Sequence, residues 1–248
     1  MKLSNFHIQS YNENGFLVIK KFFSKKDIQS ISKELNQIIN SNNQNIYLYY
    51  TRSKINKKLI LNRIENFYEN NKKIKNILDK KLKNVIYQII KTKVNLFKDK
   101  ANVKSPGAVG FEPHQDLTIW NNMYKIKEFI TVAVTIDKSN KKNGCLEISP
   151  KSHILGELAK FEKAIPLRKV KKLKWKKLIS LPGDIVIFND KTAHRSESNT
   201  SSKSRRMLFL TFNDIKYGNK IRKYFNDKIK NYPPNNLRKK NIKYNWKI

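Results

Sequence analysis

The chain has 248 residues, 39% of them hydrophobic and 11% aromatic, so it is long and apolar enough to fold as one domain and is not a disordered chain. Its formal charge is +34, from 53 basic and 19 acidic residues, but only 8 of the basic residues are Arg and the other 45 are Lys. Nucleic-acid recognition favours Arg, and Lys, Asn and Ile are abundant together here, so the charge indicates a compositional bias and no specific nucleic-acid partner.

Cysteine and apolar content restrict the class of protein further. Cys145 is the only cysteine, which excludes a disulfide framework or a thiolate metal cluster. No apolar run approaches the length of about eighteen residues that a membrane span needs, and the first residues lack the apolar core of a signal peptide. We therefore expect a cytoplasmic protein without a membrane span.

Residues 1–92 are predicted to be mainly helical and to pack on a core. Ser24 and Asp27 resemble a capping box, with Asp in place of Glu. The apolar residues that follow have helical spacing: Ile28, Ile31, Leu35, Ile38 and Ile39. A second helical stripe contains Ile74, Ile77, Leu78, Leu82, Val85, Ile86, Ile89 and Ile90.

From about residue 93 the pattern changes to short β-type runs separated by turn residues. These runs are VNLF, FITVAVTI, CLEI, KLISL, DIVIF and MLFLTF. They predict an antiparallel sandwich or barrel over residues 93–215. Residues 216–248 form a basic extension with interleaved aromatic residues, for which packing is favoured over an anion-binding surface. No repeat or second boundary interrupts the chain, so 1–248 is predicted to be a single domain.

The stretch FEPHQDLTIW, residues 111–120, contains two candidate metal ligands, His114 and Asp116. Pro113 disfavours a helix here, and in an extended segment side chains two apart share a face, so both could reach one ion while Gln115 turns away. His194 follows the apolar run DIVIF, and extended geometry places Ser196 on its face. Two histidines and one carboxylate make the facial triad of iron(II) oxygenases, although these ligand types also suit zinc.

An arginine would distinguish an oxygenase that uses 2-oxoglutarate, because the free carboxylate of this co-substrate needs a bidentate partner. Arg205 and Arg206 follow His194 by eleven and twelve residues. Periodicity does not choose between them, since alternate positions on both faces of the following strand are apolar.

Several pieces of the chain, taken in order, resemble the phytanoyl-CoA dioxygenase family of iron(II)/2-oxoglutarate oxygenases. They are FEPHQD, NGCLEISPKSH, LPGDIVIFNDKTAHRSESNTSSKSRR and, more loosely, YNENGFLVIKKFFSKKDI. The resemblance implies a mainly β fold with α-helices, in which N-terminal helices pack on a double-stranded β-helix, a jelly roll of the cupin-like kind. One position departs from the family, because Lys151 stands where the family usually has Gly.

The resemblance also implies the ligands of the site. Iron(II) would lie on His114, Asp116 and His194, and the carboxylate of 2-oxoglutarate on Arg205 and Ser196. Here the family's spacing selects Arg205 over Arg206. Trp120 and Tyr124, which follow the first two ligands, are candidates for a substrate pocket.

The implied activity is oxidation by O2 and 2-oxoglutarate, with release of succinate and CO2 and hydroxylation of an unactivated C–H bond in a small-molecule metabolite. Hydroxylation is favoured over halogenation because related halogenases lack the carboxylate that Asp116 provides. Two alternatives stay open. One is an oxygenase that acts on nucleic acid or another polyanion through its Lys-rich surface, and the other is a non-catalytic jelly-roll protein that only binds a metal. The sequence makes no prediction of oligomeric state.

Overall fold

The computed structural model describes residues 1–41, 43–159, 164–242 and 244, apart from the side chains of residues 118, 119, 121 and 122. Its strands are β1 (Phe16–Ile19), β2 (Tyr47–Arg52), β3 (Leu59–Glu65), β4 (Val94–Lys104), β5 (Phe111–His114), β6 (Phe129–Thr135), β7 (Leu146–Ile148), β8 (Lys176–Leu178), β9 (Ile185–Asn189), β10 (His194–Ser196) and β11 (Arg205–Asp214). Its α-helices are α1 (Asn5–Asn14), α2 (Lys25–Ile39), α3 (Lys72–Ile90), α4 (Leu117–Tyr124), α5 (Leu167–Val170) and α6 (Ile221–Asn231).

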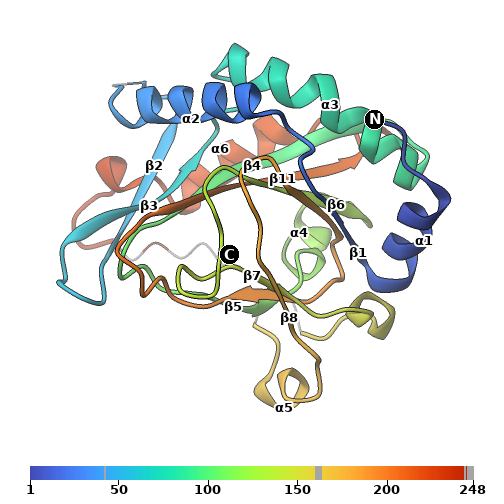
Figure 1. Cartoon of the computed structure of the whole chain (residues 1–248). Coiled ribbons are helices and arrows are strands. Elements are labelled where there is room, and N and C mark those ends of the chain that lie inside the picture. Colours follow the sequence, from blue (N-terminus) through green and yellow to red (C-terminus); the bar gives the residue numbers. More distant parts are fainter. Residues whose placement is uncertain (42, 160–163, 243, 245–248) are drawn as a thin grey trace.

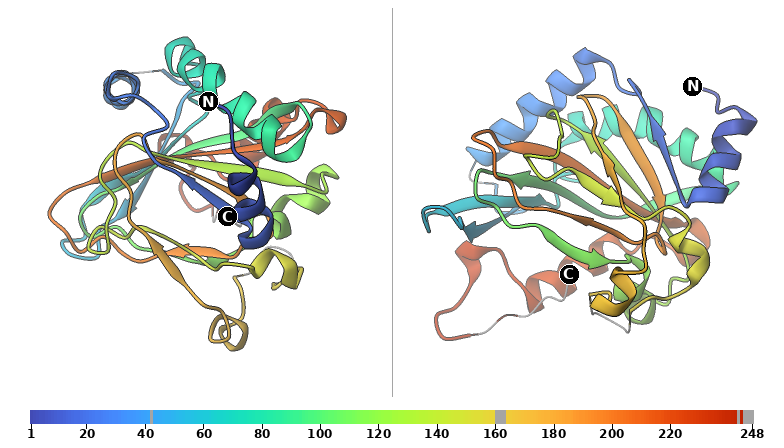
Figure 2. Two further views of the ribbon diagram at one scale, coloured as in Figure 1. Left: turned by 45° about the vertical axis from the view of Figure 1, so that its right-hand side comes forward. Right: turned by 60° about the horizontal axis from the view of Figure 1, so that its bottom comes forward.

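The strands form two antiparallel sheets that lie one over the other (Figures 1 and 2). The larger sheet has the order β1-β9-β6-β11-β4-β3-β2, and the smaller has the order β5-β10-β7-β8. Neighbouring strands in space come from distant parts of the sequence, as in a jelly roll. The expected fold, mainly β with packing helices, is confirmed.

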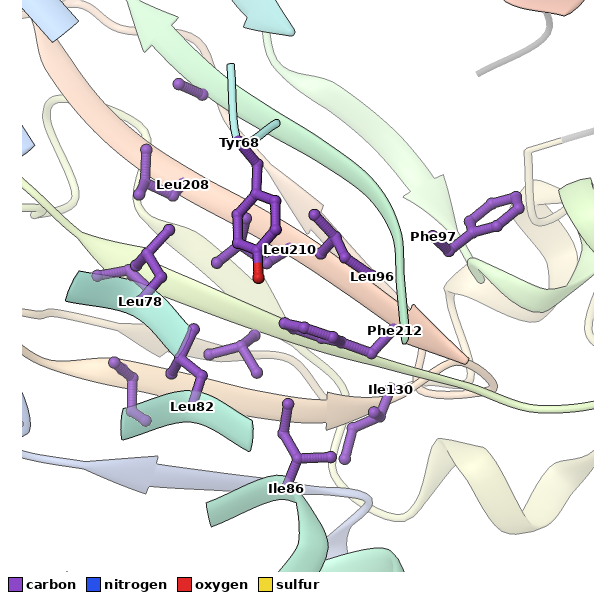
Figure 3. Packing of buried hydrophobic residues seen from close by; sticks show 14 of the residues in the cluster. Tyr68, Leu78, Leu82, Ile86, Leu96, Phe97, Ile130, Leu208, Leu210 and Phe212 are labelled. Carbon is purple, nitrogen blue, oxygen red and sulfur yellow. The ribbon is translucent and has the colours of Figure 1, made fainter. Parts of the chain in front are cut away.

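Helices α2 and α3 lie along the outer face of the larger sheet (Figures 1 and 2). Leu78, Leu82 and Ile86 of α3 are buried where they face the apolar side chains of β11 (Figure 3). The side chains on that strand face are Leu208, Leu210 and Phe212. Each such side chain contributes about 1.5–3 kcal/mol by leaving water, so this layer is the main hydrophobic core.

The opposite face of the larger sheet is mixed in character. Phe16, Phe188 and Met207 form a smaller apolar cluster with Leu146 and Ile148 of the small sheet. The remaining space between the sheets is a cavity with mostly polar and charged walls. Both faces of β11 are therefore buried, one against helices and the other against this interior.

Residues 1–92 contribute three strands in addition to the expected helices. The capping box of α2 is present, since Ser24 Oγ accepts from the Asp27 backbone N–H and the Asp27 carboxylate accepts from the Ser24 N–H. However, β1 pairs antiparallel with β9, and β2 and β3 extend the larger sheet beside β4. These strands are short and carry little periodicity, so the sequence did not reveal them.

The C-terminal residues 216–248 contain α6, in which Tyr224 packs on Phe97 of β4 and Phe225 packs on Tyr47 of β2. Lys228 on the same helix forms a buried ion pair with Glu65 of β3. Residues 243 and 245–248 of this segment lie outside the described residues. Among the described helices, none has both the length and the apolar character needed to cross a membrane.

Candidate metal centre

Strand pairing brings the two candidate histidines together. In the small sheet His194 of β10 is the register partner of His114 of β5, and their ring centroids are 4.1 Å apart. Asp116 completes the group, and the ligand atoms of the three side chains lie within 4.8 Å of one another. Three residues that are up to 80 positions apart in the sequence therefore face one point between the sheets.

Asp116 reaches this point by a different backbone conformation than the extended one expected. Strand β5 ends at His114, and Asp116 has helical torsions (φ −65°, ψ −38°) as the residue that precedes α4. Its Oδ2 accepts a 2.8 Å hydrogen bond from Thr131 Oγ1 of β6, which fixes the carboxylate. Gln115 faces away, as expected, and its side chain bonds the backbone at Gly156 and Leu158.

The imidazoles are oriented by backbone carbonyls. His114 Nδ1 lies 2.6 Å from the Glu112 oxygen, and His194 Nδ1 lies 3.0 Å from the Thr192 oxygen. A protonated Nδ1 donates in each case, so the lone pair of each Nε2 is left for a metal. Such second contacts of a ligating histidine are a regular feature of metal sites.

The charge state of the triad also suits a cation. Burial, followed by the neighbouring His194, lowers the pKa of His114 to about 3, and burial lowers the pKa of His194 as well. Burial alone would raise the pKa of Asp116, but Lys98 and then the two neighbouring histidines lower it to about 2. At neutral pH the site thus presents two neutral imidazoles and one carboxylate, the donor set of an iron(II) facial triad.

Arg205 and Arg206 occupy opposite sides of β11. Arg205 is only 2% exposed and lines the cavity, where it donates to the Gly144 oxygen, while its buried Nε has no partner among the described residues. Arg206 points outward and bonds both Asp137 oxygens through Nε and Nη2. An unsatisfied guanidinium N–H in a buried cavity fits a carboxylate ligand.

Ser196 lies beside this arginine, as expected from the sequence. Its Oγ accepts a 2.7 Å hydrogen bond from Nζ of Lys104, which is the register partner of Arg205 on β4. Burial and then the charge of Arg205 lower the pKa of Lys104 to about 7. Lys104 was not singled out from the sequence, and it adds a second cation to this end of the cavity.

Trp120 and Tyr124 are placed in the core and do not line the cavity. Trp120 is fully buried, with its ring centroid 5.6 Å from that of Phe97, and Tyr124 donates to the Asp227 carboxylate of α6. The expectation that they line a substrate pocket therefore differs from the structure. Because α4 starts directly after Asp116, it carries these aromatic residues to Phe97 of β4 and to α6, away from the cavity.

Lys151, the departure from the family pattern, adopts a left-handed conformation with φ 62°. Gly is favoured in that conformation, and Lys151 adopts it although a residue with a side chain is less suited to it. The turn therefore has the backbone conformation that a Gly would take. The triad is unaffected.

Comparison with known proteins identifies the family of the chain. The family model of phytanoyl-CoA dioxygenase matches residues 11–207. A 2-aminoethylphosphonate dioxygenase from the uncultured bacterium HF130_AEPn_1 is 33% identical over 232 residues, which are 90% of this chain and 87% of that protein. The methylphosphonate hydroxylase of Gimesia maris is 32% identical over 139 residues, 55% of this chain and 52% of that protein.

A solved structure shows the same fold. The crystal structure of EctD from S. alaskensis, determined with 2-oxoglutarate and 5-hydroxyectoine, has a TM-score of 0.74 at 16% identity and covers 87% of this chain and 77% of that one. The family match and the His-Asp-His triad confirm the expected enzyme class, an oxygenase that depends on iron and 2-oxoglutarate. The chain therefore belongs to the phytanoyl-CoA dioxygenase family.

Proposed function

We propose that the protein hydroxylates a C–H bond of a small molecule and converts 2-oxoglutarate to succinate and CO2. The observation that carries this proposal is one shared cavity, lined by the triad and by an arginine whose Nε has no partner among the described residues. In this reaction one oxygen atom of O2 enters succinate and the other enters the product hydroxyl. The substrate and 2-oxoglutarate each supply two of the four electrons that reduce O2.

Each group in the cavity has a distinct role in the proposal. Iron(II), held by His114, Asp116 and His194, would bind and activate O2 at the positions that three protein ligands leave open. Arg205 would hold the far carboxylate of 2-oxoglutarate, because its unpaired Nε–H gives a fixed, charged donor. Ser196 Oγ lies beside that position and would add a further hydrogen bond to the carboxylate.

The substrate class we propose is a small organophosphonate. Two relatives that match this chain at 32–33% identity are named for 2-aminoethylphosphonate and methylphosphonate. The cavity supports an anionic substrate, because Lys98, Lys100 and Arg205 line it, whereas Asp116 is the only carboxylate among its described lining residues. Arg195 also borders the cavity, but its guanidinium is paired with Glu147.

We also propose that residues 1–248 work as one catalytic domain, with the jelly-roll core in 93–215 and the basic extension in 216–248. The burial of Tyr224 and Phe225 of the extension in the same core as α3 supports this arrangement. A reducing cytoplasm would keep the iron ferrous, and we propose that compartment for the reaction.

The proposal is tested by adding iron(II) and 2-oxoglutarate to the protein without oxygen. A visible charge-transfer band should appear for the intact protein and be absent in His114→Ala and Asp116→Ala. Oxygen-dependent succinate release should then be measured with methylphosphonate, 2-aminoethylphosphonate and a panel of neutral metabolites. Absence of the band, or a band without succinate for every substrate, would instead favour a non-catalytic binding protein.

A further inference from the structure

Strand β4 carries a row of polar side chains along the wall of the cavity. Beyond the irregular pairing at Phe97, side chains alternate along the strand, and the odd positions Ala101 and Val103 are buried in the hydrophobic core. The even positions face the small sheet instead. They are Lys98, Lys100, Asn102 and Lys104, of which the first three line the cavity and the last contacts Ser196.

The two ends of this row have different surroundings. Lys104 is bound to Ser196 Oγ and to the Glu197 oxygen, next to Arg205, at the end proposed for 2-oxoglutarate. Lys98 lies opposite Thr211, whose hydroxyl is 3.0 Å from that of Thr131, the residue that bonds Asp116. At about 3.3 Å per residue, Lys100 and Lys98 are about 13 and 20 Å along the strand from Lys104.

The Nζ atoms of Lys98 and Lys100 have no hydrogen bond or ion pair with any residue that the structure describes. Lys98 is 3% exposed, and its Nζ lies 3.3 Å from the centroid of the Trp120 ring. Nζ of Lys100 lies between two rings, 5.3 Å from the Phe111 centroid and 5.6 Å from the Phe209 centroid. Aromatic faces stabilise an ammonium group but leave its N–H donors unsatisfied. Two such groups on one wall of the cavity are suited to an anion.

We propose that Lys98 and Lys100 form the substrate-anion site and hold the phosphonate group of the substrate on the side of the triad away from Arg205. This inference rests on the proposed function, since it concerns the substrate of the same reaction. A five-carbon dicarboxylate held at Arg205 is too short to reach Lys98 as well, so the two cationic ends serve two different anions.

The chemistry of the lysines favours a phosphonate over a carboxylate. Burial lowers the pKa of Lys98 and lowers that of Lys100 to about 8, and an anion bound between them favours the protonated form of both. Two ammonium groups then match a dianion in charge, and a tetrahedral group offers oxygens in several directions to point-charge donors. A carboxylate carries one charge and is better matched by the planar fork of Arg. Trp120 then has a positioning role, because its ring holds the ammonium group of Lys98 by a cation–π contact and does not itself touch the substrate.

The experiment compares Lys98→Met and Lys100→Met with Lys93→Met as a matched control. Lys93 is exposed just before β4, so its replacement removes the same charge outside the cavity. Methylphosphonate is the probe and acetate the monoanionic comparison. Binding is followed by calorimetry on the metal-free protein and by the perturbation of the charge-transfer band in the anaerobic protein loaded with iron(II) and 2-oxoglutarate. Thermal melting checks that each variant is folded. If only one of the two lysine variants folds, that variant alone is enough to test the inference.

We expect each cavity variant to weaken methylphosphonate binding by about 10- to 100-fold, the usual effect of losing one charged donor. The affinity for 2-oxoglutarate should stay that of the parent protein, and Lys93→Met should bind both ligands normally. Acetate should bind more weakly than methylphosphonate to the parent.

Three results would overturn the inference. They are unchanged methylphosphonate binding in a folded cavity variant, equal weakening in Lys93→Met, and no methylphosphonate binding by a parent protein that does form the 2-oxoglutarate band. In the last case the proposed 2-oxoglutarate-dependent oxidation still stands, but the proposed phosphonate substrate class does not. If the band itself fails to form, the proposed function fails, while calorimetry on the metal-free protein still decides the role of the lysines.

Discussion

At the scale of single residues, Arg205 and Arg206 make the most direct test of the site. They are adjacent in the sequence, yet Arg205 is in the cavity and Arg206 is paired with Asp137 on the other face. Arg205→Ala should raise the 2-oxoglutarate concentration needed for half-maximal succinate formation by about 10- to 100-fold, because a charged bidentate donor is lost. Arg206→Ala should leave this concentration unchanged and cost about 1 kcal/mol of stability.

These two variants are compared by titrating 2-oxoglutarate and by thermal melting. The reverse pattern, with the raised requirement in Arg206→Ala, would show that the register of β11 is wrong. The sequence could not make this choice from periodicity, because both faces of β11 are buried and both carry apolar residues. Only the family's spacing selected Arg205, and the structure places that residue in the cavity.

Lys104 predicts a pH dependence of 2-oxoglutarate binding. Its pKa is lowered to about 7, chiefly by burial and then by Arg205. The protonated form attracts the carboxylate, and this form is lost as pH rises through 7, so the affinity should fall between about pH 6.5 and 8.5. The charge-transfer band, titrated with 2-oxoglutarate at several pH values, measures this change. In Lys104→Met the affinity should be lower throughout, and the slope over this range should disappear.

At the scale of elements, β4 explains what the sequence analysis missed. Its even positions were not considered as site residues, because alternating polar residues on a strand normally face solvent. Here the polar face lines the cavity between the sheets, and the run KDKANVK has the alternation that would have indicated it. The opposite error concerned α4. Trp120 and Tyr124, which follow the two ligands, were expected to line a substrate pocket, but the helix places both side chains in the core.

Helix α3 provides a prediction about stability at this scale. Leu82 is 1% exposed in the layer between α3 and β11, so Leu82→Ala should lower the free energy of unfolding by about 2–5 kcal/mol through loss of contacts and the remaining cavity. Lys80→Ala, on the exposed side of the same helix, is the control and should change stability little. Denaturant unfolding measures both. If Leu82→Ala lowered the free energy of unfolding as little as Lys80→Ala does, α3 would not pack on β11 as described.

At the scale of the whole molecule, the charge of +34 predicts non-specific attraction to polyanions. The protein should bind duplex DNA at about 50 mM salt without sequence preference, and this binding should be largely lost by about 200 mM salt. Fluorescence anisotropy with two unrelated duplexes at several salt concentrations tests the expectation. Sequence-specific binding, or binding that persists at high salt, would support the alternative in which nucleic acid is the substrate.

The pairing of His114 with His194 has a further consequence for how the enzyme matures. Side chains alternate with a period of two along a strand, so a slip of one residue between β5 and β10 would turn one imidazole to the other face and dismantle the site. Only chains with the native strand register can then acquire the metal, and the metal in turn stabilises that register. Chains with the wrong strand register would thus bind no iron and would have no oxidative activity.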